Sequence, residues 1–500
     1  MSDPEITHLN PLPTADECYQ ALVSRDARFD GLFYTGVLTT GIYCRSVCPA
    51  PKPKAENCRY FHHAAQAESA GFRPCLKCRP EQSPGSAWMD RSHHSWQQLS
   101  WLMESEPDLG VSQLAERLGM TDRHLRRIVQ QHTGMALQTL ITSRRLLLAK
   151  TLLTDTQQSV TDIALQAGFG SLRRLQDAMQ QHYQLSPSDL RKKASRESTS
   201  AGSALFTLGY RPPYDWAHQF AFLAQRRIEG VEYVQGVEDS HLPYRYVRTA
   251  RVQHQGQWLS GWIAAEPNES RHQLRIEISE SLLPAAAALL AQLKHLFDLE
   301  ARIVVIETQL GPLAANYPGT RLPGAFNGFE MAVRTVLGQQ ISITNATKLC
   351  GKVAALGPEV QSGLASLPAH EQAALRHYFP TEEEFQHFEQ SRLGELGVIR
   401  QRSKALLALA QAMTAGDISL HPGANPELTR ERLLALPGIG PWSANYILMR
   451  ALHYPDAWPD WDYVLKMRTG LTTPKALREH MEAFRPWRAY ATLHIWRNEP

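Results

Sequence analysis

Five of the seven cysteines in this 500-residue chain fall in one stretch, GIYCRSVCPAPKPKAENCRYFHHAAQAESAGFRPCLKC. Cys44 and Cys48 form one close pair, Cys75 and Cys78 form a second, and a loop separates the two pairs. This arrangement lets four sulfurs meet one tetrahedral Zn²⁺. The spacing therefore predicts a zinc site with four cysteine ligands. It leaves open whether that site is an inert clip that holds the local fold or a reactive centre.

The composition narrows the class of protein. The formal net charge is +3, and residues 1–200 hold 23 Lys and Arg against 20 Asp and Glu, so the small basic excess lies in the N-terminal part. Such an excess agrees with nucleic-acid binding without proving it. Clustered cysteines favour metal binding or catalysis over a secreted disulfide framework. The first residues show no basic segment followed by an apolar run, so we expect a cytoplasmic protein with no membrane segment.

Two segments between residues 88 and 190 share one plan, VSQLAERLGMTDRHLRRIVQQHTG and SVTDIALQAGFGSLRRLQDAMQQHY. Each reads as a helix, a turn with glycine, and a second helix that opens with Thr or Ser. The second helices are expected to expose five arginines, Arg123, Arg126, Arg127, Arg173 and Arg174. Two such helix-turn-helix units can enter successive major grooves of double-stranded DNA without a dimer, so we expect a monomer. Arginine binds phosphate as readily as guanine, so the bases that it contacts stay open.

The rest of the chain divides by composition and periodicity, because 500 residues are too many for one core. Residues 191–204 are small, polar and charged, which predicts a linker. Next, YRYVRTARVQ, WLSGWIAAE and LRIEIS alternate like strands and precede the helix AAAALLAQLKHLF. The expected fold is therefore multidomain and mainly α: an α+β zinc module (1–85), an all-α double helix-turn-helix domain (88–190), an α+β domain (205–318) and an all-α domain (319–500).

The stretch LPGIG at 436–440 lies between two predicted helices and is typical of a helix-hairpin-helix. Gly438 and Gly440 allow a tight turn, after which the amide groups at the start of the next helix can face a DNA phosphate. The alternative is a glycine-rich junction between two helices. About twenty residues further on, AWPDWDYVLK places an acidic residue at the start of another helix.

The N-terminal part resembles the Ada-type adaptive-response regulators, from about residue 16 to residue 190. The resemblance rests on TTGIYCRSVC and AGFRPCLKC, which carry all four ligand positions, followed by the helix-turn-helix pair. It implies that Cys44 accepts a methyl group from a methylphosphotriester in the DNA backbone, with Cys48, Cys75 and Cys78 as the other zinc ligands. A thiolate held by zinc is nucleophilic at neutral pH, which agrees with that role. In the family, methyl uptake activates transcription, so promoter DNA and RNA polymerase are the implied partners.

Residues 205–500 resemble the helix-hairpin-helix DNA glycosylases, and above all the inducible 3-methyladenine DNA glycosylase. The matching stretches are YRPPYDWAHQFAFLAQR, RLPGAFNGFEMAVRTVLGQQIS, LPGIGPWSANY and PWRAYATLHIW. The family's catalytic aspartate precedes Tyr-x-x-Lys, which selects Asp462, with Asp460 as a rival because one residue is inserted here relative to the pattern. Alternatively, Asp462 has only the structural role of a helix N-cap. The implied base pocket is aromatic, formed by Trp442, Tyr446, Tyr463 and Trp496.

Two positions depart from the glycosylase pattern. In the family an apolar wedge follows the first glutamine of the Gly-Gln pair, here Gln339, and fills the gap left by the flipped nucleotide. This chain has Gln340 at the wedge position, so either Gln340 fills the gap or Ile341 assists. Arg497 replaces a family aromatic. These departures leave open a rival reading, a DNA-binding transcriptional regulator whose glycosylase-like half is inactive.

The reaction type follows from other positions. Glycosylases that also cut the strand carry a lysine two residues after the last hairpin glycine, and here that residue is Trp442, which implies a monofunctional enzyme. The second half of the chain has only Cys350, so no iron–sulfur cluster is expected. A Pro-Cys-His-Arg-Val acceptor motif is missing, so we expect no O6-methylguanine transferase. The chain therefore resembles a fusion of a methyl-sensing activator with an enzyme that excises alkylated bases.

Overall fold

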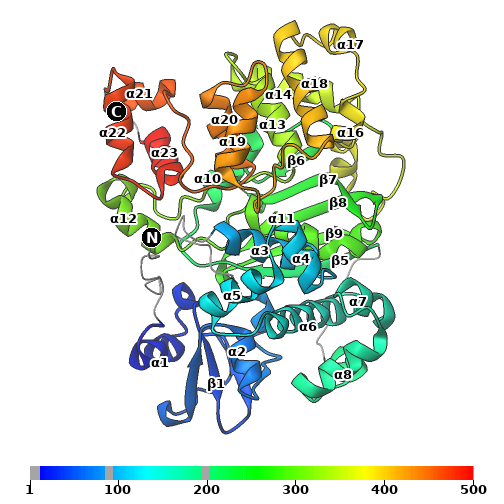
Figure 1. Ribbon diagram of the computed structural model, residues 1–500, viewed down its shortest axis with the longest axis vertical. Coiled ribbons are helices and arrows are strands. Elements are labelled where there is room, and N and C mark those ends of the chain that lie inside the picture. The colour runs from blue at the N-terminus through cyan, green and yellow to red at the C-terminus, as the bar shows by residue number, and fades with distance from the viewer. Residues whose placement is uncertain (1–11, 85–93, 194–201, 240, 499–500) are drawn as a thin grey trace. The chain divides into compact units, whose positions relative to one another are not determined.

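The computed structural model describes residues 12–84, 94–193, 202–239 and 241–498 (Figure 1). They fall into two compact units: Met1–Thr199 with Ala204–Pro212 and Glu269–Gln273, and Ser200–Ser203 with Pro213–Asn268 and Leu274–Pro500. Most of the predicted linker, residues 194–201, lies outside the described residues. Within the described ranges, no helix has both the length and the apolar character needed to span a membrane.

The first unit opens with a small sheet whose strand order is β3-β1-β2-β4. Its elements are α1 (Ala15–Ser24), β1 (Tyr34–Val37), β2 (Ile42–Cys44), β3 (Cys58–Phe61), α2 (Ala64–Ser69) and β4 (Arg73–Pro74). β1 pairs antiparallel with β2 and β3, whereas β2 and β4 are parallel, with Tyr43 opposite Pro74. The parallel pair brings the two strand ends together, and the chain enters cysteine-bearing loops there.

Helices follow the small sheet in the first unit. They are α3 (His94–Ser105), α4 (Val111–Arg117), α5 (Asp122–Thr133), α6 (Leu137–Asp155), α7 (Val160–Gln166), α8 (Leu172–Tyr183) and α9 (Pro187–Lys193). The pairs α4–α5 and α7–α8 are the two predicted helix-turn-helix units, and α6 is the long helix that connects them (Figure 1). Gly119 and Gly168 make the turns with φ angles of 62° and 81°, a conformation that favours glycine.

A buried ionic cluster joins the zinc module to α6. Lys150 of α6 is 1% exposed, forms an ion pair with Glu81 and donates a hydrogen bond to the carbonyl oxygen of Cys75. Arg79 pairs with Glu81 at 2.9 Å and with Asp155 at 2.8 Å. Breaking one partner of such a buried pair leaves an uncompensated charge, which costs about 3–5 kcal/mol. The zinc module and the long helix are therefore packed as one body.

A second buried link runs through Glu68 of α2. Its Oε1 accepts hydrogen bonds from the hydroxyl groups of Tyr43 at 3.0 Å and Tyr183 at 3.4 Å. Tyr43 precedes Cys44, and Tyr183 ends the second recognition helix, α8. Burial raises the pKa of Glu68 to about 7.

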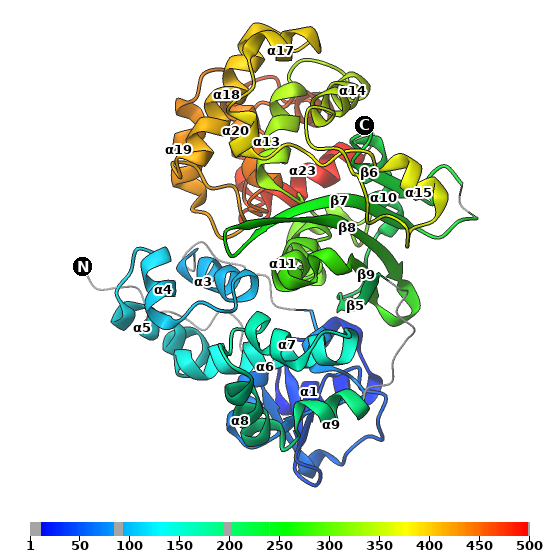
Figure 2. The same cartoon turned by 90° about the vertical axis from the view of Figure 1, so that its right-hand side faces the viewer.

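Further along the chain is a five-stranded sheet of order β5-β9-β8-β7-β6. The second unit holds β6 (Glu232–Gln235), β7 (Arg245–His254), β8 (Gln257–Asn268) and all but the first residue of β9 (Gln273–Ser279), whereas β5 (Ser203–Gly209) belongs to the first unit from Ala204 onward. Figure 2 shows α11 (Ala286–Leu296) on one face of this sheet and α13 (Gly328–Leu337) on the other. A buried ion pair of 2.5 Å between Arg248 of β7 and Glu330 of α13 joins the sheet to the helical part.

The other helices of this unit are α10 (Trp216–Gln225), α12 (Ile303–Leu310), α14 (Ile343–Ala354), α15 (Ala369–Ala374), α16 (Glu382–Phe385), α17 (Gln390–Glu395), α18 (Arg400–Thr414), α19 (Pro426–Ala435), α20 (Pro441–Arg450), α21 (Tyr463–Thr469), α22 (Pro474–Glu482) and α23 (Arg488–Arg497). The predicted fold class is confirmed, as are the three predicted strands and the helix that follows them. The edge strands β5 and β6 were not predicted.

Candidate functional site

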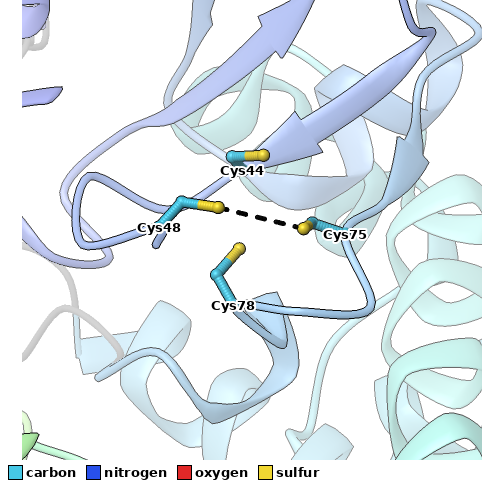
Figure 3. A group of neighbouring side chains, drawn as sticks. All are labelled: Cys44, Cys48, Cys75 and Cys78. Atoms are coloured by element: carbon cyan, nitrogen blue, oxygen red, sulfur yellow. Dashed lines mark hydrogen bonds between the residues drawn. The ribbon is translucent and has the colours of Figure 1, made fainter. Parts of the chain in front are cut away.

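The four predicted zinc ligands converge on one point (Figure 3). Cys44 ends β2, Cys75 follows β4, and the sulfurs of Cys44, Cys48, Cys75 and Cys78 all lie within 4.8 Å of one another and are buried. The sulfurs of Cys48 and Cys75 are 3.9 Å apart. A tetrahedral zinc site with bonds of about 2.3 Å requires sulfurs about 3.8 Å apart, so the four side chains fit the ion. They form the Zn²⁺ site of this protein.

One backbone amide donates a hydrogen bond to a sulfur of the cluster. The amide of Arg45 donates to the sulfur of Cys78 at 3.4 Å. Hydrogen bonds to a thiolate hold its lone pairs and make it a weaker nucleophile.

A buried ion pair fixes the turn after Cys44. The guanidinium of Arg45 pairs with Asp30 and donates to the carbonyl oxygen of Cys78 at 3.0 Å. Arg25, at the end of α1, donates to the carbonyl oxygen of Cys48 at 3.1 Å. These two arginines therefore hold both cysteine loops in place by bonds to backbone oxygens.

The recognition helices present the five predicted arginines to solvent. Thr121 and Ser171 cap α5 and α8 by accepting hydrogen bonds from the third amide of each helix. The side chains that face outward are Arg123, Arg126, Arg127, Arg173 and Arg174. Arg173 is 91% exposed and lies 3.9 Å from Asp177, a weak surface pair that leaves it available to DNA.

The helix-hairpin-helix turn joins α19 to α20. Gly438 has a φ angle of 80°, and Gly440 is the N-cap of α20, with open space where a side chain would lie. The Nε2 of Gln339 donates to the carbonyl oxygen of Gly438 at 2.9 Å and to the hydroxyl of Ser443 at 3.0 Å. Gln339 therefore braces the hairpin, while the neighbouring Gln340 is exposed with a φ angle of 54°.

Asp462 lies between two tryptophans. Its Oδ2 accepts a hydrogen bond from the Nε1 of Trp442 at 2.9 Å, and its Oδ1 accepts one from the Nε1 of Trp496 at 3.0 Å. The same Oδ1 accepts the amide of Leu465 at 3.0 Å, so Asp462 also caps α21. The carboxylate is 7% exposed. Three N–H groups therefore donate hydrogen bonds to this buried side chain and fix its position.

Asp460, the rival aspartate, has different surroundings. Its nearest basic partner is Arg478 at 4.0 Å, and its Oδ1 is buried without a hydrogen bond. Asp460 is not joined to the tryptophans that bind Asp462. The geometry therefore favours Asp462 as the residue that faces the aromatic cluster.

Three of the four predicted pocket aromatics lie together. The rings of Trp442 and Tyr446 stack with centroids 5.1 Å apart at 21°, and Trp496 lies 6.3 Å from Tyr446. Tyr463 follows Asp462 in the chain and is 67% exposed. The cluster therefore joins flat apolar faces to a buried carboxylate, an arrangement that suits an electron-poor base whose sugar lies beside an anion.

Three residues that were not predicted as pocket residues lie beside the aromatic cluster. Phe222 lies between the guanidinium groups of Arg226, 3.9 Å from its ring centroid, and Arg450, at 4.6 Å. Arg450 also donates to the hydroxyl of Tyr446 at 2.8 Å. Burial opposes ionisation of that phenol, but the nearby guanidinium groups outweigh it and lower the pKa of Tyr446. The stretch YDWAHQFAFLAQR contains Phe222 and Arg226, so the resemblance could have signalled both.

Arg497 points away from the cluster. It forms an ion pair of 2.7 Å with Asp215 and a hydrogen bond of 2.6 Å with Thr320, and its guanidinium lies over the ring of Tyr317. The replacement of an aromatic at this position is therefore accommodated by contacts within the fold.

Together these features define a class of protein: a DNA-binding protein with a zinc–thiolate centre, two helix-turn-helix units and a helix-hairpin-helix domain with an aromatic, carboxylate-bearing site. Three family models match it, the metal binding domain of Ada over residues 17–81, a helix-turn-helix domain over 114–193 and the AlkA N-terminal domain over 205–327.

Relatives extend the match along the chain. The "Probable bifunctional transcriptional activator/DNA repair enzyme AlkA" of Mycobacterium tuberculosis is 35% identical and aligned over 96% of both chains. "DNA-3-methyladenine glycosylase 2" of Escherichia coli is 37% identical over 59% of this chain and 98% of its own. The Escherichia coli "Bifunctional transcriptional activator/DNA repair enzyme Ada" is 36% identical over 31% of this chain and 43% of its own. The chain belongs to the AlkA-type family of bifunctional transcriptional activator/DNA repair enzymes.

Proposed function

We propose that the second unit hydrolyses the N-glycosidic bond of alkylated bases such as 3-methyladenine in DNA. The observation that carries this proposal is the Asp462 carboxylate, held between the indole groups of Trp442 and Trp496. The flipped base stacks against Trp442, Tyr446 and Trp496, with Tyr463 at the mouth of the pocket. Gly438 and Gly440 bind a phosphate, and Gln339 and Gln340 lie at the gap left by the flipped nucleotide.

The chemistry follows from the charges. The bond between C1′ and the base nitrogen breaks, and its electron pair leaves with the base. The sugar becomes oxocarbenium-like, and the negative charge of Asp462 stabilises it from close range. Water then adds its oxygen to C1′, and the proton that it releases passes to Asp462 or to solvent. A base-release assay on alkylated DNA tests the proposal, and no released base would favour the reading of an inactive, DNA-gripping half.

The product is an intact strand with an abasic site. A lyase needs an amine to form a Schiff base with C1′, and the corresponding position carries Trp442. Borohydride reduction during the reaction should therefore trap no enzyme–DNA adduct. A trapped adduct would contradict the monofunctional mechanism.

The first unit takes up a methyl group on Cys44. The Cys44 sulfur attacks the methyl carbon of a DNA methylphosphotriester, the carbon–oxygen bond breaks, and the phosphodiester leaves with its electron pair. The product is a thioether, so each molecule reacts once. Zn²⁺ on the four cysteines keeps their sulfurs deprotonated at neutral pH. The amide hydrogen bond to Cys78 makes that sulfur a weaker nucleophile than one without such a donor, and the choice of Cys44 among the ligands follows the resemblance to the Ada-type regulators.

Promoter DNA is the second DNA partner. The exposed arginines of α5 and α8 contact successive major grooves, and the protein acts as a monomer because both recognition helices lie in one chain. Contact with RNA polymerase then activates transcription. Size determination by light scattering tests the monomer, and run-off transcription with purified polymerase tests the activator role. We place the domain boundaries at 1–85, 88–190, 205–318 and 319–500, with the linker at 191–204.

A further inference from the structure

An exposed aromatic patch surrounds the start of α21, next to Asp462. We call Trp461, Tyr463, Lys466 and Met467 the α21 patch. Its three apolar members are 37%, 67% and 63% exposed. The Lys466 Nζ lies 4.3 Å from the ring centroid of Trp461 and 6.0 Å from that of Tyr463. A cation among exposed rings suits a nucleic acid, which offers flat bases and phosphate together.

Trp461 has an unfavourable backbone conformation. Its φ angle of 61° lies in the left-handed region, which a bulky residue adopts only when its surroundings impose it. The next residue, Asp462, is held by hydrogen bonds from the two indole groups and from the amide of Leu465. Trp461 separates this aspartate from Asp460.

The position of Trp461 limits what it can touch. Adjacent Cα atoms are about 3.8 Å apart, so Trp461 begins next to the residue that acts on the sugar of the flipped nucleotide. Neighbouring base pairs along a DNA strand are separated by about 3.4 Å. An exposed indole beside that residue is placed to meet a nucleotide that neighbours the lesion if the strand runs past it. Gln340, at the usual wedge position, offers no aromatic surface to that strand.

We propose that Trp461 stacks on the base that flanks the lesion in the damaged strand, with Lys466 facing the adjoining phosphate. This inference rests on the proposed glycosylase function, because Asp462 sets the place of the sugar. Stacking would hold the distorted strand open while the damaged base occupies the pocket. Trp461 is thus a positioning residue, and it supplies affinity for the opened duplex that a polar Gln340 does not.

The test compares Trp461→Ala, Trp461→Phe and Trp461→Gly in the full-length protein, with Val304→Ala as a control at another exposed apolar site. The DNA carries a tetrahydrofuran abasic analogue with 2-aminopurine on one side or the other. Trp461→Ala loses the stacking contact with one base, so its affinity for this DNA should be about tenfold lower than that of wild type. The affinity of Trp461→Phe, which keeps a ring, should fall less. When wild type binds, stacking on Trp461 should change the fluorescence of 2-aminopurine placed on one side of the lesion but not on the other. The change should be absent with Trp461→Ala.

Thermal unfolding separates stacking from a structural role. Trp461→Gly suits a positive φ, so its midpoint should equal or exceed that of wild type while its affinity falls. A midpoint that falls in parallel with affinity would overturn the proposal, as would unchanged affinity and fluorescence in Trp461→Ala. This binding assay needs no base excision, whereas failure of the glycosylase function would show as absent base release by wild type.

Discussion

The two units each bury one reactive anion, and they stabilise it by different means. Cys44 is 8% exposed among three further sulfurs that share its Zn²⁺ site, whereas Asp462 is 7% exposed among three N–H donors. In the proposed mechanisms, the thiolate of Cys44 forms a lasting bond to carbon and is consumed. The carboxylate of Asp462 acts through its charge and is restored after each cycle. A protein can therefore combine a single-use sensor with a recycling enzyme when each anion has its own kind of partner.

Of the predicted changes, replacement of Asp462 should have the largest effect, and that effect is on base release. Asp462→Asn keeps the size and the cap of α21 but removes the charge, so base release should fall by about 10²–10³-fold. Folding and DNA binding should persist, as circular dichroism and a binding titration would show. Asp460→Asn is the matched control and should release base normally. The reverse result, with only Asp460→Asn inactive, would move the catalytic role to Asp460.

Methylation of Cys44 should change DNA affinity by a smaller factor. The site with four thiolates on Zn²⁺ has a formal charge of −2, and a thioether at Cys44 makes it −1. One unit of charge about 7 Å from a phosphate is worth about 0.6 kcal/mol in water and about 2.4 kcal/mol at an effective dielectric of 20. Promoter binding should tighten about ten- to a hundredfold at low salt and less at high salt.

The measurement is a promoter titration at two salt concentrations, before and after reaction with methylphosphotriester DNA. Mass spectrometry must find one methyl group, on Cys44, and Cys44→Ser should gain none. Equal affinity in both states would reduce the zinc module to a repair device. Methyl on another cysteine, or none at all, would contradict the role of Cys44.

Removing either indole donor should lower the rate of base release about tenfold. Trp442→Phe and Trp496→Phe each keep a ring but lose one hydrogen bond to a charged acceptor, worth about 1.5–3 kcal/mol. The lost bond no longer holds the carboxylate in place beside the sugar, so the rate constant of base release should fall. Single-turnover kinetics of base release test this, and an unchanged rate constant with weaker DNA binding would show that the tryptophans only bind the base.

The smallest expected effect concerns the buried Glu68, which accepts a hydrogen bond from Tyr43, the residue before Cys44. Burial raises the pKa of Glu68 from 4.5 to about 7, so the folded state binds this proton more tightly than the unfolded state. Its contribution to stability is thus full below pH 4.5 and is lost as the pH rises to about 7. Relative to Glu68→Gln, the unfolding midpoint of wild type should fall by a few degrees across that range. Parallel curves for the two proteins would contradict a raised pKa.

Local spacing made parts of this molecule predictable from sequence. The two cysteine pairs specify the zinc ligands because each pair lies in one short loop, and Thr121 and Ser171 mark the recognition helices as caps. The choice between Asp460 and Asp462 depended on Trp442 and Trp496, which meet the carboxylate only through the tertiary fold. Phe222 and Arg226 lie in a stretch that the resemblance already marked, but their contact with Arg450 was not predictable because α10 and α20 approach one another only in the folded unit.

The hydrogen bond from Lys150 to the carbonyl oxygen of Cys75 has a consequence for metal loss. That oxygen belongs to a zinc ligand, and Lys150 lies on the helix that connects both helix-turn-helix units. Because the ion holds the loop that presents this oxygen, we expect chelation to free the loop and to weaken its contact with α6. The ion pairs that Lys150 and Arg79 form with Glu81 do not involve a zinc ligand and should persist. Loss of the metal should therefore lower the stability of the zinc module more than that of the helices packed against it.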